Sequence, residues 1–161
     1  RDKGLNKTIE IWLNEISTLY KDAELHIFGI NKIKTNYKKK YLRSKKIFFK
    51  GRVGKDELKK TYEKSFAMIC LGYDETFCLN ALEANACGLP VITLGKTALK
   101  DYVVHNNNGF IANNYNELSA AIVKMMNINK NKHKKLINNS ILWSKKYLLK
   151  KIINNWLMIF K

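Results

Sequence analysis

Two short, almost entirely apolar segments constrain the fold of this chain more than any other feature. They are FAMICL at residues 66–71 and LPVITL at residues 89–94, and a segment of helical composition from about Phe77 to Cys87 separates them. Strands that are apolar on both faces are typical of parallel sheets, because helices cover both faces of such a sheet. A parallel pair also needs a long crossover connection, which the helical segment provides. The two segments therefore predict an α/β layer.

The same alternation of strands and helices runs along the rest of the chain. Strands are predicted at residues 24–29, 46–51 and 110–112, and helices at about residues 5–20, 55–65 and 117–127. Gly88 is the expected C-terminal cap of the helix at 77–87, and Asn116 the expected N-terminal cap of the helix at 117–127. We therefore predict one Rossmann-like domain over residues 1–161, with helices on both faces of a parallel sheet. Amphipathic helices are expected over residues 131–161.

The charge of the chain leaves two interpretations open. The formal net charge is +17, which suggests a phosphate ligand, a nucleic acid or an acidic membrane surface as partner. Only three of the 30 basic residues are arginines, and lysine-rich surfaces are often simply solvated. The three cysteines form no CxxC pair, which favours a reducing cytoplasm, and the three histidines are scattered, which argues against a zinc site held by the protein. No signal peptide or membrane-spanning segment is predicted, and the abrupt start suggests that upstream sequence is missing.

Two glutamates frame the predicted helix after the first apolar strand. Glu75 lies just before it and Glu83 lies about two turns further along. In parallel sheets ligands bind where strands end and helices begin, and a helix N-terminus favours an anion such as a diphosphate. The backbone N–H groups of Phe77, Cys78 and Leu79 would face that anion, while a carboxylate accepts hydrogen bonds from a ribose diol or a sugar ring. In the alternative interpretation, Glu83 pairs with a lysine and Glu75 only favours the helix N-terminus.

The segment containing these glutamates resembles the E-x7-E signature of the retaining family-4 (group 1) glycosyltransferases, written E-x-F-G-x-x-x-x-E-A-x-A-x-G-x-P-V. The matching positions are Glu75, Phe77, Glu83, Ala84, Ala86, Gly88, Pro90 and Val91. Further similarity lies in Lys3-Gly4 before a helix, in a stretch from Phe49 to Tyr62, and around Gly109. The resemblance covers nearly the whole chain.

The resemblance implies the C-terminal, donor-binding half of a GT-B glycosyltransferase. Glu83 would contact the ribose hydroxyls, Glu75 the donor sugar, and the N–H groups at residues 77–79 the diphosphate. Lys3 would neutralise the diphosphate, although as a single lysine it also suits a solvated surface. Gly51, Arg52 and Val53 would border the base. Glu75 and Lys3 would thus support a metal-independent transfer that retains anomeric configuration, without a cofactor.

The sequence also departs from the family pattern. Cys78 replaces the usual glycine, and Thr97-Ala98 stands where many members carry two glycines. The first, central strand of the sheet and the N-terminal acceptor domain would precede this chain. We therefore expect little activity from residues 1–161 alone.

The expected function is transfer of a sugar from a nucleotide-diphosphate sugar to a glycan or lipid-linked acceptor, in polysaccharide or lipopolysaccharide biosynthesis. The expected location is cytoplasmic, with peripheral contact at the inner face of the membrane as one role for the basic tail at residues 145–161. The other role is packing on the protein's own core or on the missing N-terminal domain. Two alternatives remain: a nucleotide-sugar-binding module without transfer activity, and a basic nucleic-acid-binding domain. Scarce arginine and the lack of a nucleic-acid motif argue against the last.

Overall fold

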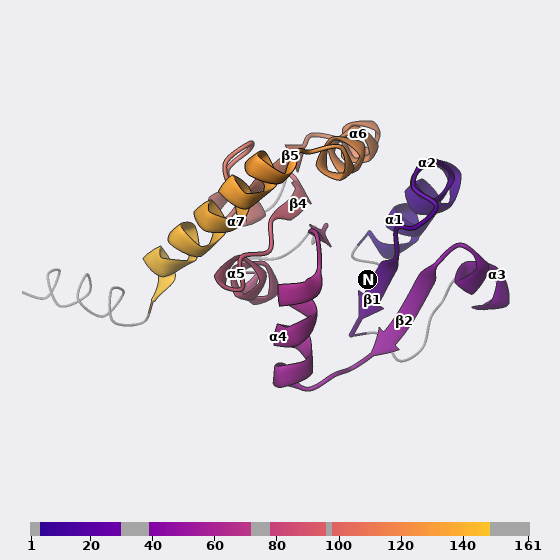
Figure 1. Ribbon diagram of the computed structural model, residues 1–161, viewed down its shortest axis with the longest axis horizontal. Coiled ribbons are helices and arrows are strands. Elements are labelled where there is room, and N and C mark those ends of the chain that lie inside the picture. Colours follow the sequence, from indigo (N-terminus) through magenta and orange to yellow (C-terminus); the bar gives the residue numbers. More distant parts are fainter. Residues whose placement is uncertain (1–3, 30–38, 72–77, 96–97, 149–161) are drawn as a thin grey trace, which may run out of the picture. The chain divides into compact units, whose positions relative to one another are not determined.

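The computed structural model describes residues 4–29, 39–71, 78–95 and 98–148 (Figure 1). The predicted roles of Lys3, Glu75 and Phe77 lie outside the described residues. The chain divides into two compact units, residues 1–60 and residues 61–161. Each unit is described by itself.

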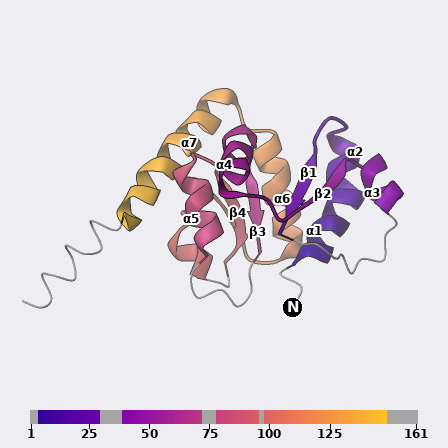
Figure 2. The same cartoon turned by 90° about the horizontal axis from the view of Figure 1, so that it is seen from below.

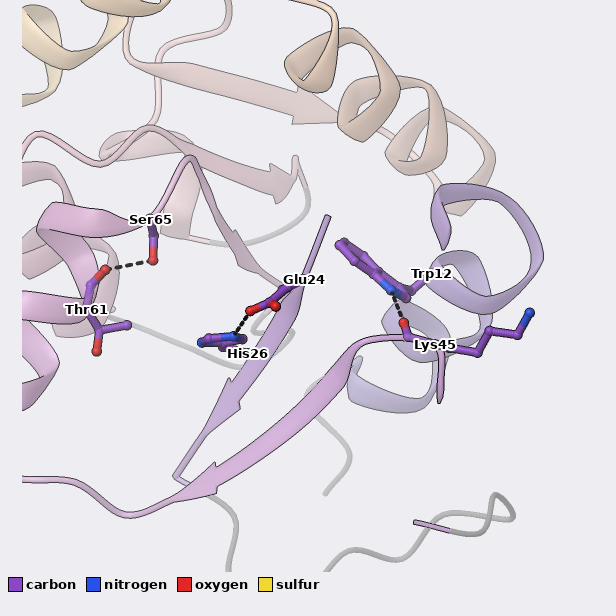
Figure 3. A network of polar contacts seen from close by, with 6 residues as sticks. All are labelled: Trp12, Glu24, His26, Lys45, Thr61 and Ser65. Carbon is purple, nitrogen blue, oxygen red and sulfur yellow. Dashed lines mark hydrogen bonds and ion pairs between the residues drawn. The ribbon is translucent and has the colours of Figure 1, made fainter. Parts of the chain in front are cut away.

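The first unit opens with the predicted N-terminal helix, which contains a change of pitch. It consists of α1 (Leu5–Ile11), a π-helical segment η1 (Trp12–Ile16) and α2 (Ser17–Leu19). Its apolar face is buried, as the helical spacing predicts: Ile9, Ile11, Trp12, Leu13 and Ile16. The Trp12 indole N–H donates to the carbonyl of Lys45 at 3.1 Å, which ties the π-helical segment to the chain just before the second strand (Figure 3).

The strands of the first unit form a parallel pair. Strand β1 (Leu25–Phe28) pairs with β2 (Ile47–Gly51), and α3 (Lys39–Ser44) lies between them in the chain. The pair ends at two glycines in the left-handed region, where the N–H of Gly29 donates to the carbonyl of Gly51 at 2.7 Å. Helix α4 (Lys55–Lys64) then leads into the second unit.

The second unit is a parallel α/β layer. Strands β3 (Met68–Cys70), β4 (Val91–Leu94) and β5 (Gly109–Ala112) lie in that order and are parallel. Helices α5 (Leu79–Ala86) and α6 (Tyr115–Met126) lie on opposite sides of the β3–β4 pair (Figure 2). Helix α7 (Lys130–Ser144) packs against α5, and the short 3-10 helices are η2 (Ala98–Asp101) and η3 (Lys145–Tyr147). The predicted fold class, a parallel sheet with helices on both faces, is confirmed.

Burial differs between the two strands that the apolar segments predict. All four residues of β4 are buried, whereas the three residues of β3 are only half-buried. The reason is position: β4 has a strand on each side, but β3 pairs only with β4 among the described residues.

The ends of the helices follow local hydrogen-bonding rules. Gly88, at φ +80°, ends α5 in a Schellman motif: its N–H donates to Asn85 and the next N–H, of Leu89, donates to Ala84. The predicted role of Gly88 is therefore confirmed. The expected cap at Asn116 is wrong, because the side chain of Asn114 accepts from the N–H of Glu117 and α6 begins two residues earlier.

A buried polar group holds the turn before β5. The fully buried Asn108 accepts at Oδ1 from the N–H of Val104 at 2.7 Å and donates from Nδ2 to the carbonyl of Tyr102 at 2.8 Å. Its own carbonyl accepts from the Ser140 hydroxyl of α7 at 3.3 Å. Asn85 of α5 reaches the same Tyr102 carbonyl at 3.3 Å. These bonds link α5, α7 and the turn at residues 102–108.

Candidate functional site

The N-terminus of α5 differs in its capping from those of the two helices that follow it. Its capping residue, Cys78, makes no side-chain cap hydrogen bond, and the first turn contains no acidic residue. By contrast, Asn114 and Asn129 cap α6 and α7 with their side chains. The first helical bonds run from Ala81 and Leu82 to the carbonyl of Cys78, so the N–H groups of the preceding helical residues have no partner inside the helix. With the helix dipole, this end offers donors and positive potential together.

Glu83 lies on an exposed stripe of α5 that begins at this N-terminus. The stripe follows helical spacing through Leu79, Glu83 and Ala86, all exposed, whereas Ala81, Ala84 and Asn85 face the core. Four residues separate Leu79 from Glu83, about 6 Å along the helix axis. None of the ion pairs between described residues involves Glu83. The alternative interpretation, Glu83 paired with a lysine, therefore has no support in the described part of the chain.

Tyr62 of α4 belongs to the surroundings of Glu83. Burial, and after it the negative charge of Glu83, raise the pKa of its phenol from 10.0 to about 12. Tyr62 packs against the core cluster that contains Cys78 and Ala81. The phenol thus stays protonated at neutral pH and can donate a hydrogen bond. The sequence reasoning matched Tyr62 to the family pattern but gave it no role in the site.

The three residues predicted to border the base lie in the first unit. Gly51 ends β2 with φ +68°, Arg52 is exposed, and Val53 is half-buried. They follow the carboxyl end of a parallel strand, which is the edge where the sequence analysis places them. The side chain of Cys78, in contrast, is only 4% exposed and points into the core of the second unit. Only its backbone suits the predicted anion contact.

A cavity of about 380 Å³ lies elsewhere in the second unit, and the sequence reasoning missed it. Its lining combines amides, ammonium groups and one apolar side chain: Asn106, Asn129, Asn131, Lys132, Lys135 and Leu136. None of the predicted donor-binding residues that the structure describes contributes to it. Among the described residues, no cluster of three or more histidine, cysteine or acidic side chains is arranged to hold a metal ion. None of the described helices is long and apolar enough to cross a membrane.

Comparison with known proteins identifies the family of this chain. Residues 1–143 match the family "Glycosyl transferases group 1", and the chain belongs to it. A curated relative, the poly(glycerol-phosphate) alpha-glucosyltransferase of Bacillus subtilis, is 28% identical in an alignment of length 142 that covers 84% of this chain and 20% of the relative. The sequence resemblance to group 1 glycosyltransferases is thereby confirmed.

Solved structures show the same fold at lower identity. TarM is 22% identical, with a TM-score of 0.80 over 99% of this chain and 32% of TarM. The C-terminal domain of LpcC from Francisella tularensis, also a group 1 glycosyltransferase, is 22% identical, with a TM-score of 0.74 over 91% of this chain and 80% of that domain. The chain thus corresponds to a small part of several longer relatives and to most of one isolated C-terminal domain.

Proposed function

We propose that this chain is the donor-binding half of a retaining glycosyltransferase that moves a sugar from a nucleotide-diphosphate sugar to a glycan or lipid-linked acceptor. The observation that carries the proposal is the N-terminus of α5, where the side chain of Cys78 makes no cap hydrogen bond, with an exposed carboxylate, Glu83, one turn further on. Glu83 lies about 6 Å along the helix axis from Leu79, so its carboxylate would be available to the ribose of a nucleotide whose diphosphate binds at the helix end.

The proposed roles of the residues in sugar transfer follow from where charge develops in the transition state. When the bond between sugar and diphosphate breaks, negative charge grows on the leaving phosphate, and the N–H groups around Cys78 and Leu79 would stabilise it. Lys3 would add a mobile positive charge, and Glu75 would position the sugar and stabilise its developing positive charge. In this proposal no metal ion takes part and anomeric configuration is retained. Gly51, Arg52 and Val53 are the residues that we propose for contact with the base.

The relatives suggest which molecules to test first. A crystal structure of a TarM mutant from S. aureus contains fondaparinux, alpha-GlcNAc-glycerol and UDP, and one of the pneumococcal O-GlcNAc transferase GtfA contains UDP and GlcNAc. Another structure with this fold is that of WaaG, a glycosyltransferase involved in lipopolysaccharide biosynthesis. We therefore propose a UDP-sugar as donor and a glycan or lipid-linked acceptor at the inner face of the membrane. The net charge of +17 supports an anionic acceptor or surface.

A thermal-shift panel of UDP-, GDP- and ADP-sugars tests donor binding, because a ligand that binds only the native state raises the melting temperature. Glu83→Ala should abolish the shift while the unliganded protein melts as before. Two charge-assisted hydrogen bonds to a ribose contribute about 3 kcal/mol in total, or about 100-fold in Kd. Glu63→Ala, which removes an exposed glutamate from α4, is the matched control and should keep the shift.

An unchanged shift in Glu83→Ala contradicts the ribose assignment. A sugar-transfer assay on the natural full-length protein then separates a transferase from a binding module without activity. Salt-sensitive DNA binding that excludes UDP would instead favour the nucleic-acid alternative.

A further inference from the structure

Two cysteines meet at the start of α5. Cys70 is the last residue of β3 and Cys78 is the capping residue of α5, and their sulfur atoms lie 3.5 Å apart. Neither is in a disulfide in this structure. A disulfide needs a separation of about 2.0 Å, so a shift of about 1.5 Å joins the two atoms.

The surroundings of the pair favour bond formation between these two cysteines. Cys78 is 4% exposed and Cys70 is half-buried, so an oxidant in solvent reaches Cys70 more readily. Cys78 belongs to the buried cluster that contains Ala81 and Leu89, and Cys70 packs against that cluster, which holds both side chains in place. The third cysteine, Cys87, lies nine residues after Cys78, about 13 Å along α5, which is too far for a Cys78–Cys87 bridge.

We propose that Cys70 and Cys78 are an oxidisable dithiol, and that their disulfide switches off nucleotide-sugar binding. Hydrogen peroxide oxidises the Cys70 thiolate to a sulfenic acid and releases hydroxide. The sulfur of Cys78 then attacks the sulfenic sulfur, and the S–OH bond breaks. Protonation of the departing hydroxide gives water, so two thiols and one peroxide yield one disulfide and two waters. A dithiol reductant reverses the step by exchange.

The functional half of this inference rests on the proposed function. The backbone N–H of Cys78 belongs to the set that we assign to the diphosphate. A bond to Cys70 pulls this residue toward the end of β3 and fixes the α5 N-terminus in a new position. Donors at an anion site act within a narrow range of distances, so the displaced terminus should no longer bind the diphosphate.

Disulfide mapping tests the chemical half without any ligand. The chain is treated with peroxide, alkylated, digested and analysed by mass spectrometry. Wild type and Cys87→Ser should give one disulfide-linked peptide pair that contains Cys70 and Cys78. Cys70→Ser and Cys78→Ser should give none. A bridge to Cys87, or alkylation of all three cysteines as in untreated protein, overturns the proposal, and because wild type decides the mapping, a misfolded variant does not obscure it.

The thermal-shift response tests the functional half on the Cys87→Ser variant, which keeps the pair. Reduced protein should be stabilised by the UDP-sugar, oxidised protein should lose the shift, and dithiothreitol should restore it. An undiminished shift in fully oxidised protein overturns the switch. If reduced protein responds to no donor, the proposed function fails and the switch fails with it, while the mapping still decides whether the disulfide forms.

Discussion

The contact between Gly109 of β5 and Val91 of β4 makes a sharp test of the sheet. A Cβ atom added at Gly109 would lie 2.0 Å from the carbonyl oxygen of Val91 and 2.9 Å from its carbonyl carbon. Real Cβ contacts below 3.0 Å are essentially never seen. Gly109 is not in the left-handed region, so the space between the strands, and not backbone dihedral strain, requires glycine here. Gly109→Ala therefore has to separate β5 from β4 by about 1 Å or more.

The cost follows from what this separation breaks. Overpacking a core position costs about 1–3 kcal/mol, and a fixed backbone atom places this substitution at the upper end. Each strand hydrogen bond that the movement breaks adds about 1 kcal/mol. We expect Gly109→Ala to lower the free energy of unfolding by about 4 kcal/mol. That loss shifts the urea midpoint down by about 1–4 M.

Gly95→Ala is the matched control, because it lies at the end of β4 in the same sheet. Its Cβ would meet the Ile111 methyl group at 3.0 Å, and a side-chain end can move aside. The expected loss is about 1 kcal/mol. Urea unfolding followed by circular dichroism measures both variants. Equal urea midpoints for the two variants would refute the reasoning that the backbone carbonyl of Val91 leaves no room for a side chain at position 109.

Two further predictions concern buried polar groups. Asn108→Ala removes the partner of the buried Val104 N–H and the shorter of the two hydrogen bonds to the Tyr102 carbonyl, so the free energy of unfolding should fall by about 3 kcal/mol in urea unfolding. The half-buried Asn139 donates one hydrogen bond to the carbonyl of Asn107, and Asn139→Ala should lose only about 1 kcal/mol. A loss in Asn108→Ala no larger than in Asn139→Ala contradicts this role. For Tyr62 the folded-state pKa of about 12 exceeds the ordinary 10.0, so the unfolded state loses the phenol proton first and stability declines as pH rises from 10 to 12. Tyr62→Phe should show a shallower decline of melting temperature over this range than wild type or the exposed Tyr41→Phe; parallel curves would be inconsistent with the shifted pKa.

The pattern of apolar residues predicts most of the fold, because the positions that are buried in the core must be apolar. The buried strand β4 and the apolar face of the first helix, with Ile9 and Ile16 fully buried, lie where periodicity places them. The π-helical segment at Trp12 escapes prediction, because a bond from its indole to Lys45, 33 residues away, accompanies it. The sequence does contain the signal for the cap at Asn114, because Asn-x-x-Glu from Asn114 to Glu117 is a capping signature. The prediction of Asn116 chose the wrong one of two asparagines that lie two positions apart.

The site is less predictable than the fold. Sequence motifs point to Glu83 and the start of α5, and the structure adds that Glu83 is exposed and that the Cys78 side chain makes no cap hydrogen bond. The proximity of Cys70 to Cys78 depends on how β3 and α5 pack, and seven intervening residues do not encode it. The assigned roles of Lys3 and Glu75 remain predictions.

The buried amide of Asn108 has a consequence for how the protein ages. It precedes Gly109, and an asparagine followed by glycine deamidates readily, because the unhindered glycine nitrogen attacks the side-chain carbonyl to form a succinimide. Two hydrogen bonds hold this side chain away from that attack in the folded state. Chemical damage should therefore accumulate only during unfolded excursions, as an isoaspartate assay on heat-stressed protein can detect. A deamidated molecule would place a carboxylate at this buried position, and a carboxylate cannot donate to the Tyr102 carbonyl. Deamidation during unfolding would therefore destabilise the second unit irreversibly.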